Sequence, residues 1–195
     1  MLLLERESQP GYHTTGRSAA LFTETYGNPV MRALTRASKQ FLQHPPAGFA
    51  AVDLLAPRGT LLVAREEQLP ALRRTHAACA ELVDNLRWLS GAEVRGRVPC
   101  FDAGQVAAGL LEPDAMDIDV HALLQGFLRG LRARGGEVRC GVEVRCGVEV
   151  RALDRVAGGR WRGATAAGEF IAPLLVNAAG AWADEIGRLA GARPL

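Results

Sequence analysis

The segment 1–7, MLLLERE, begins with four apolar residues that are followed by an acid, Glu5. An uninterrupted apolar run of this kind is typical of a strand buried on both faces, as in a parallel sheet. A carboxylate at the end of such a strand can accept hydrogen bonds from the hydroxyls of a nucleotide ribose. A solvent-exposed acid at a strand end looks the same, so Glu5 alone leaves both interpretations open. The other half of a dinucleotide site, a GxGxxG turn about 20 residues earlier, does not occur in the sequence.

Helical and strand-like patterns alternate beyond this segment. Asn28-Pro29 predicts a capped helix that ends at Pro45-Pro46, and Ser90 to Glu93 is a capping box for a short helix. Asp117 or Asp119 caps a third helix, which ends at Gly135-Gly136. Strands are expected at 1–5, twice within 49–64, at 106–113 and repeatedly within 137–177, and further helices from Glu66 and from about Ala181.

This order predicts an α/β fold with an interruption. Residues 1–41 and 114–195 would be two parts of one nucleotide-binding domain, and residues 42–113 would be an α+β insert. "GGRWRG" at 158–163 cannot replace the missing turn, because it lacks the spacing and no strand-to-helix junction surrounds it.

Composition narrows the class of protein. Of 195 residues, 48% are hydrophobic and 23% are charged, which is ordinary for a globular protein, and the net charge of +2 gives no reason to expect nucleic acid. No apolar run is long enough for a membrane span, and Glu5 and Glu7 interrupt any signal peptide. The four cysteines form no CxxC pair, so we expect reduced thiols, a cytoplasmic location and no metal.

Two further stretches are suited to a nucleotide. "HTTGRSAA" at 13–20 combines a glycine with hydroxyl side chains, although surface loops often share this composition. "PLLVNAAGAWADEIGRLAG" at 173–191 predicts a buried strand, three small residues at a turn, and a helix. Small residues at that junction let a ligand lie against the backbone near a helix N-terminus, but they also suit tight helix–strand packing.

In this order, "LLLERE…HTTGRSAA", "LEPDAMDIDVHALLQGFLRGLRARGGEV" and "LLVNAAGAWADEIGRLAG" resemble the FAD-dependent oxidoreductases of the D-amino-acid oxidase and glycine oxidase type. The D-arginine dehydrogenase-like branch is the most similar, and the resemblance covers essentially the whole chain. It implies FAD as the cofactor. It also implies a sequence truncated at both ends: a partial FAD-binding Rossmann-like domain without its first strand and GxGxxG, with an inserted α+β substrate domain.

The resemblance assigns cofactor roles by position. Glu5 would hold the adenosine ribose, with Arg6 beside it. The loop would surround the pyrophosphate and the flavin through Thr14, Thr15, Gly16, Arg17, Ser18, Ala19 and Ala20. The later turn would close over the cofactor through Ala178, Ala179, Gly180 and Trp182.

The adenine contact depends on an internal repeat. "EVRCGV" occupies 137–142 and again 143–148. Six is an even number, so a duplication of this length keeps every strand side chain on its original face. The resemblance gives the backbone of Val150 the adenine contact, or that of Val144 if the first copy keeps the register.

The resemblance also implies a reaction. In the intact parent protein, a small-molecule amine or D-amino acid would transfer a hydride to flavin, and the imine would hydrolyse to a keto acid, whereas the isolated fragment is expected to be inactive. Tyr26 is the candidate catalytic residue near the substrate, and Thr60 stands where the D-arginine branch leads us to expect an acid. Because a neutral hydroxyl cannot pair with a guanidinium as a carboxylate does, a neutral D-amino acid or a secondary amine such as sarcosine or proline fits equally well. The alternative is a non-functional truncated reading frame that does not bind FAD.

Overall fold

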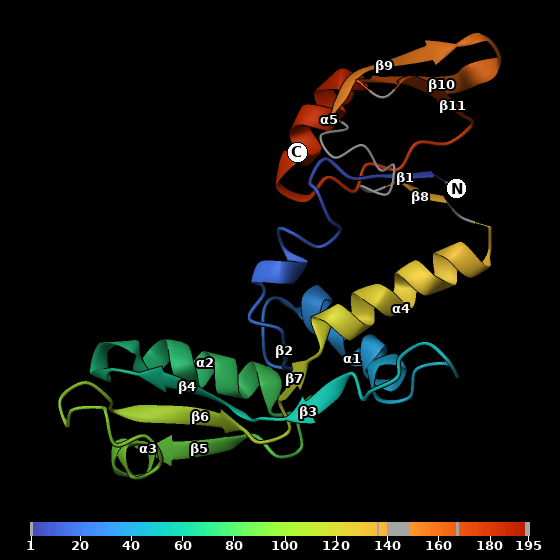
Figure 1. Ribbon diagram of the computed structural model, residues 1–195. Coiled ribbons are helices and arrows are strands. Elements are labelled where there is room, and N and C mark those ends of the chain that lie inside the picture. The colour runs from blue at the N-terminus through green and yellow to red at the C-terminus, as the bar shows by residue number, and fades with distance from the viewer. Residues whose placement is uncertain (1, 136, 140–148, 167, 194–195) are drawn as a thin grey trace. The chain divides into compact units, whose positions relative to one another are not determined.

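The computed structural model describes residues 2–135, 137–139, 149–166 and 168–193 (Figure 1). The chain divides into two compact units: unit 1 comprises Met1–Ser18 and Leu124–Leu195, and unit 2 comprises Ala19–Leu123. The predicted boundaries at 41/42 and 113/114 both fall inside unit 2. Our assignment of cofactor and substrate domains stays a prediction.

Unit 1 contains a parallel strand pair and an antiparallel meander. The apolar run forms β1 (Leu2–Leu4), which pairs in parallel with β8 (Glu137–Arg139). The expected burial on both faces is wrong, because Leu3 is 38% exposed. The meander has the order β11-β10-β9, with β9 (Val150–Val156), β10 (Arg160–Thr165) and β11 (Gly168–Ala172). Gly158 and Gly159 adopt φ values of +77° and +70° between β9 and β10. The glycine pair therefore makes a hairpin turn and no strand-to-helix turn, as its spacing predicts.

The α-helices α4 and α5 belong wholly or partly to unit 1. α5 (Ala183–Leu189) follows the short 3-10 helix η4 (Gly180–Trp182) near the expected position. α4 (Val120–Ala133) is capped by Asp119, whose Oδ1 accepts a hydrogen bond from the backbone of Ala122, while Asp117 lies in a strand. The division between the units falls inside α4.

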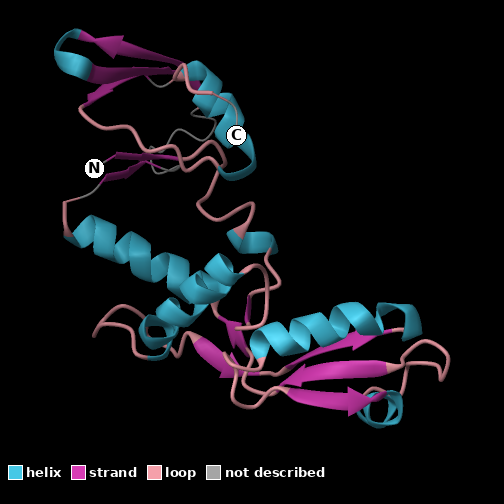
Figure 2. Ribbon diagram, turned by 180° about the vertical axis from the view of Figure 1, so that it is seen from behind, coloured by secondary structure: helices cyan, strands magenta, loops and turns pink. Residues whose placement is uncertain are grey.

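The main sheet of unit 2 is covered by one helix on each face (Figure 2). Its order is β4-β6-β5, all antiparallel, with β4 (Thr60–Ala64), β6 (Ala108–Glu112) and β5 (Arg87–Ser90). Alternate residues face opposite sides. Leu110 packs with Leu72 of α2 (Leu69–Cys79), whereas Leu89 packs with Val94 of α3 (Gly91–Arg97). The capping box at Ser90 is confirmed. The Ser90 side chain accepts a hydrogen bond from the Glu93 backbone N–H, and the Glu93 side chain accepts one from the Ser90 backbone N–H.

A second antiparallel sheet in unit 2 has the order β2-β7-β3, with β2 (Leu21–Phe22), β7 (Met116–Ile118) and β3 (Leu55–Pro57). Phe22, Leu54 and Leu42 form its buried core with the end of α1 (Pro29–Gln43). α1 begins as predicted, because the Asn28 side chain accepts a hydrogen bond from the Met31 backbone.

One strand prediction is wrong. Residues 173–177 form no strand, and Leu174 and Val176 are about three-quarters exposed, at 75% and 76%. The apolar run suggested burial, but Pro173 follows β11 directly and has no N–H to donate to a ladder. The repeat residues 140–148, with Cys140, Cys146 and Val144, lie outside the described residues.

Candidate functional site

Glu5 lies directly after β1, as the sequence predicts. Its Oε1 accepts a hydrogen bond from the Glu7 backbone N–H at 3.0 Å, and the residue is half-buried. This local bond fixes the direction of the carboxylate at the end of the strand. Each carboxylate oxygen has two acceptor positions, so the group can still accept hydrogen bonds from ribose hydroxyls.

Arg6 and Trp182 are brought together although they lie far apart in the sequence. The Arg6 guanidinium carbon is 4.5 Å from the centroid of the Trp182 ring, within the range of a cation–π contact. The His13 ring lies against the same indole, with centroids 4.6 Å apart. Three of the stretches that the sequence singled out, the end of β1, the 13–20 loop and the 173–191 turn, therefore meet within unit 1.

Glu7 holds His13 in this position. The His13 Nε2 atom lies 2.7 Å from Glu7 Oε1, and an Arg6 nitrogen lies 3.4 Å from the same oxygen. The pKa of Glu7 lies below its ordinary value, mainly because of the hydrogen bond from His13; partial burial acts in the opposite direction. Sequence reasoning missed Glu7 and His13 as individual residues, although both lie within the quoted motifs.

The loop around Gly16 is tightly closed. The Gly16 N–H donates to the Gly11 carbonyl at 2.6 Å, and a Cβ on Gly16 would lie 2.6 Å from that same oxygen. Gly16 therefore cannot carry a side chain without moving the backbone. Thr15, Gly16 and Arg17 form a single 3-10 turn preceded by Thr14, and Arg17 stacks on Tyr12 at 5.1 Å. The first segment of unit 1 ends at Ser18, and the remaining loop candidates, Ala19 and Ala20, are the first residues of unit 2.

The turn at 177–183 is held by the Asn177 side chain. Its Oδ1 accepts from the Ala179 backbone at 3.2 Å, and its Nδ2 donates to the Ala183 carbonyl at 2.8 Å. Ala178 and Gly180 lie exposed between these anchors, and Gly180 has a φ of +55°. The turn thus presents backbone and methyl groups, as the sequence suggested, although no strand leads into it. Val150 is the first residue of β9, and its adenine role stays a prediction.

Unit 2 holds the two residues assigned to the substrate. Tyr26 is 68% exposed in the loop before α1, and Thr60 begins β4, opposite Glu112 on β6. No hydrogen bond joins Tyr26 to Thr60 among the described residues of this unit. The predicted substrate pair is therefore not assembled by a direct polar contact.

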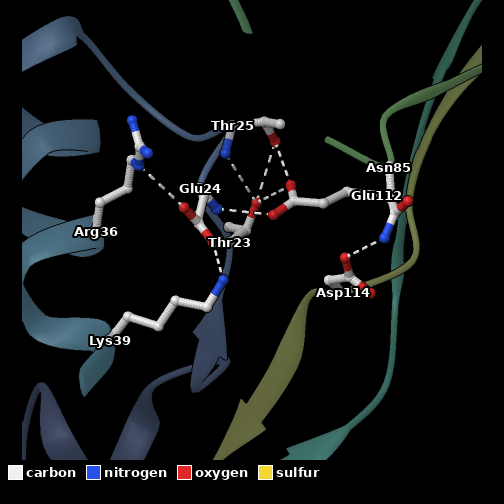
Figure 3. Close-up of polar contacts among 8 residues, drawn as sticks. All are labelled: Thr23, Glu24, Thr25, Arg36, Lys39, Asn85, Glu112 and Asp114. Atoms are coloured by element: carbon white, nitrogen blue, oxygen red, sulfur yellow. Dashed lines mark hydrogen bonds and ion pairs between the residues drawn. The ribbon is translucent and has the colours of Figure 1, made fainter. Parts of the chain in front are cut away.

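Sequence reasoning did not single out two buried acids of unit 2, Glu112 and Glu24. They are 2% and 8% exposed and lie at the centre of the polar network in Figure 3. One sequence signal could have found Glu112: Ala108, Leu110 and Glu112 alternate along β6, so the acid has the same orientation as two core residues.

A cavity of about 590 Å³ lies beside this network. It is lined by charges of both signs, among them Glu24, Arg36, Lys39 and Asp114. Asp114 Oδ2 accepts a hydrogen bond from Asn85 at 2.7 Å on the same wall. Neither Tyr26 nor Thr60 lines this cavity, so it is separate from the predicted substrate residues.

Among the residues the structure describes, no group of three or more His, Cys, Asp or Glu side chains could hold a metal ion. Cys79 and Cys100 are free, and burial raises the pKa of the Cys79 thiol, which disfavours a nucleophilic thiolate. No helix in the described residues is long and apolar enough to cross a membrane.

Comparison with known proteins gives a match over the whole chain. Residues 1–195 match the sequence model of the family described as FAD dependent oxidoreductase, DAO. Human mitochondrial dimethylglycine dehydrogenase is 30% identical over 99 residues, which are 51% of this chain and 11% of that protein.

Many solved structures share the fold, and two of them serve as examples. Glycine oxidase from Geobacillus kaustophilus has a TM-score of 0.77 and 19% identity, covering 97% of this chain and 51% of its own. L-alpha-glycerophosphate oxidase from Mycoplasma pneumoniae, solved with FAD bound, also has a TM-score of 0.77 and 19% identity, covering 99% and 51%. The chain therefore spans about half the length of these structures.

Proposed function

The chain belongs to the DAO family of FAD-dependent oxidoreductases, and from this premise we propose that the protein containing it oxidises the C–N bond of a small amine or D-amino acid. The convergence of Arg6, His13 and Trp182 beside Glu5 in unit 1 is the observation that best supports a cofactor site there. It joins the sequence stretches that the resemblance to flavoenzymes assigned to FAD.

The residues of unit 1 fit an FAD molecule in their chemistry. Glu5 offers carboxylate oxygens to ribose hydroxyls, and Arg6 offers a positive charge next to an aromatic ring. The loop backbone closes on itself at Gly16, where a Cβ would lie 2.6 Å from the Gly11 carbonyl oxygen, so the conformation of this loop requires glycine. We propose that Glu5 holds the ribose and that the loop 14–18 and the turn 178–182 bind the remainder of the cofactor.

FAD, when bound, supplies the redox chemistry by accepting a hydride from the substrate Cα. The substrate would lose a hydride from Cα and a proton from nitrogen to become an imine. Water would then convert the imine to a carbonyl compound and ammonia, or to a carbonyl compound and an amine where the substrate is a secondary amine. The role of the protein is to orient the amine. We propose that Tyr26, exposed and preceding α1, contacts the substrate.

The nature of Thr60 supports a neutral substrate. A carboxylate at this position could form a charge-assisted pair with a guanidinium, whereas a threonine hydroxyl cannot. We therefore propose a neutral D-amino acid or a secondary amine in preference to D-arginine. The names of two similar proteins, glycine oxidase and dimethylglycine dehydrogenase, also indicate substrates with a C–N bond.

A second candidate is oxidation of an alcohol. The Mycoplasma glycerophosphate oxidase has the same TM-score as glycine oxidase, and its name indicates a substrate without an amine. The two candidates differ in the bond that is oxidised, C–N or C–O.

Anaerobic reduction of the bound flavin distinguishes the two. The FAD-loaded protein that contains this chain is mixed with D-alanine or with D-lactate, which have the same carbon skeleton and differ only in nitrogen against oxygen. Sarcosine, proline, D-arginine and glycerol phosphate extend the series. We expect loss of the visible flavin absorbance with at least one neutral amine, with release of the matching amine product. Bleaching by D-lactate or glycerol phosphate alone would overturn the proposal.

A further inference from the structure

Glu112 accepts hydrogen bonds from three consecutive residues, 23–25, of the loop that leads to Tyr26. Its Oε2 accepts hydrogen bonds from the hydroxyls of Thr23 at 2.6 Å and Thr25 at 2.7 Å. Its Oε1 accepts the backbone N–H of Glu24 at 2.8 Å. As Figure 3 shows, all three donors point at one carboxylate from three consecutive residues.

The same segment is also anchored to α1, through the side chain of Glu24. The Glu24 carboxylate lies 2.5 Å from Lys39 Nζ and 3.3 Å from Arg36 Nε, both on α1 (Figure 3). The Sγ of Cys79, at the end of α2, donates weakly to the Thr25 carbonyl at 3.8 Å. Residues 23–25 are therefore held by β6, α1 and α2 together.

Tyr26 is the first residue beyond this anchored segment. Its side chain is 68% exposed, while the adjacent segment contains the buried Glu24. Gly27 follows with a φ of +82°, and a Cβ there would lie 2.8 Å from the sulfur of Met31. The backbone on both sides of Tyr26 is thus constrained, and its starting direction depends on residues 23–25.

Burying a carboxylate at an inward position of β6 lowers the stability of the fold unless its oxygens are hydrogen-bonded. Leucine would suit the alternation of the strand, as Leu110 does two residues earlier. A leucine could accept none of the three hydrogen bonds. The carboxylate at this position is explained by the loop that it binds.

We propose that Glu112 is a positioning residue that fixes the Thr23–Thr25 segment and thereby sets the orientation of Tyr26 toward the substrate. The proposal rests on the proposed function, because it needs Tyr26 to contact the amine. Glu112 itself touches neither substrate nor cofactor in this scheme.

The test uses the tyrosine content of the chain, which is two: Tyr12 in unit 1 and Tyr26 in unit 2. In the fluorotyrosine-labelled protein that contains this chain, the ¹⁹F resonances of these two residues are assigned with Tyr12→Phe and Tyr26→Phe. In Glu112→Gln the amide nitrogen cannot accept a hydrogen bond, so we expect the Tyr26 resonance to shift or broaden while Tyr12 stays unchanged. An unchanged Tyr26 resonance would overturn the proposal without reference to activity.

The control variants separate positioning from general damage. Asp114→Asn changes an exposed acid two residues away, whose amide oxygen can still accept from Asn85, and should leave both resonances unchanged. Thr25→Ser keeps the hydroxyl and should behave as the unmodified chain, whereas Thr25→Val should reproduce the effect of Glu112→Gln. If Thr25→Ser and Thr25→Val behave alike, the hydroxyl bond to Glu112 does not set Tyr26, and the proposal is wrong.

A kinetic measurement connects the loop to the substrate. In the FAD-loaded protein we expect Glu112→Gln to raise KM for the amine by about 2- to 10-fold, the cost of ordering one side chain on binding, with a smaller change in the limiting rate. Tyr26→Ala should raise KM at least as much. A raised KM in Tyr26→Ala with no change in Glu112→Gln would overturn the inference alone. No change in Tyr26→Ala would remove the substrate role of Tyr26 from the proposed function.

Discussion

Replacing Glu5 with alanine should weaken FAD binding by about 1.5–3 kcal/mol, the usual contribution of hydrogen bonds to a charged group. This corresponds to a Kd that is about 10- to 150-fold higher. One oxygen of Glu5 already accepts the Glu7 N–H at 3.0 Å, so the carboxylate direction is set before the cofactor arrives. Loss of that local bond should lower the stability of folding by only about 0.5–1.5 kcal/mol, because the residue is half-buried at a strand end.

The assay is titration of the apoprotein with FAD, followed by flavin fluorescence, together with thermal melts. Glu185→Ala is the matched control, since it removes an exposed acid on α5 of the same unit and should leave Kd unchanged. Glu5→Gln keeps one acceptor oxygen and should fall between the alanine variant and the unmodified chain. An unchanged Kd in Glu5→Ala would mean that Glu5 is a solvated strand end.

Three other predictions concern the local structure. Ser90→Ala should destabilise unit 2 by about 1 kcal/mol through loss of the α3 cap, measured by thermal melting, and Ser90→Asp should restore the stability. The lowered pKa of Glu7 means that its hydrogen bond with His13 stabilises the fold above the unfolded pKa near 4.5, and that this contribution is lost as the pH falls through the lower folded pKa. An NMR titration of the Glu7 carboxyl should show the depressed value, and Glu7 titrating at its ordinary value would contradict the contact. Gly163→Ala should cost about 1 kcal/mol, because its Cβ would lie 1.9 Å from the half-buried Phe170 ring; equal melting temperatures would show that the ring moves aside without loss.

Local signals predicted several element starts correctly, whereas the strands β2, β5 and β7 were not predicted. The Asn28 cap, the Ser90 capping box and the apolar strand at the N-terminus depend on a few neighbouring residues, and each is present. The strand expected at 173–177 failed because an apolar run indicates burial only when a ladder partner and a covering layer exist. Those are properties of the fold, and Leu174 and Val176 have neither sufficient cover nor a strand partner among the described residues.

The candidate site also contains residues that local sequence could predict and residues that it could not. Glu5, Arg6 and Trp182 could be chosen from motifs because each belongs to a recognisable strand end or turn. The contact of His13 with Trp182 spans most of the chain and has no signal in local sequence. Glu112 was missed because its three hydrogen-bond donors lie 87–89 residues away in the chain, a separation that gives no local sequence signal.

Flavin reduction by a substrate deuterated at Cα tests the central claim, that the reaction removes a hydride from the carbon next to nitrogen. The FAD-loaded protein that contains this chain is mixed, in the absence of oxygen, with an excess of the amine that reduces it fastest. The same excess is used for the amine with deuterium at Cα and for the amine without it. The account predicts clearly slower loss of flavin absorbance for the deuterated amine and release of the corresponding ammonia or amine in an amount equal to the flavin reduced. Equal rates for the two amines, together with an isotope effect for a matched alcohol deuterated at its carbinol carbon, would contradict it.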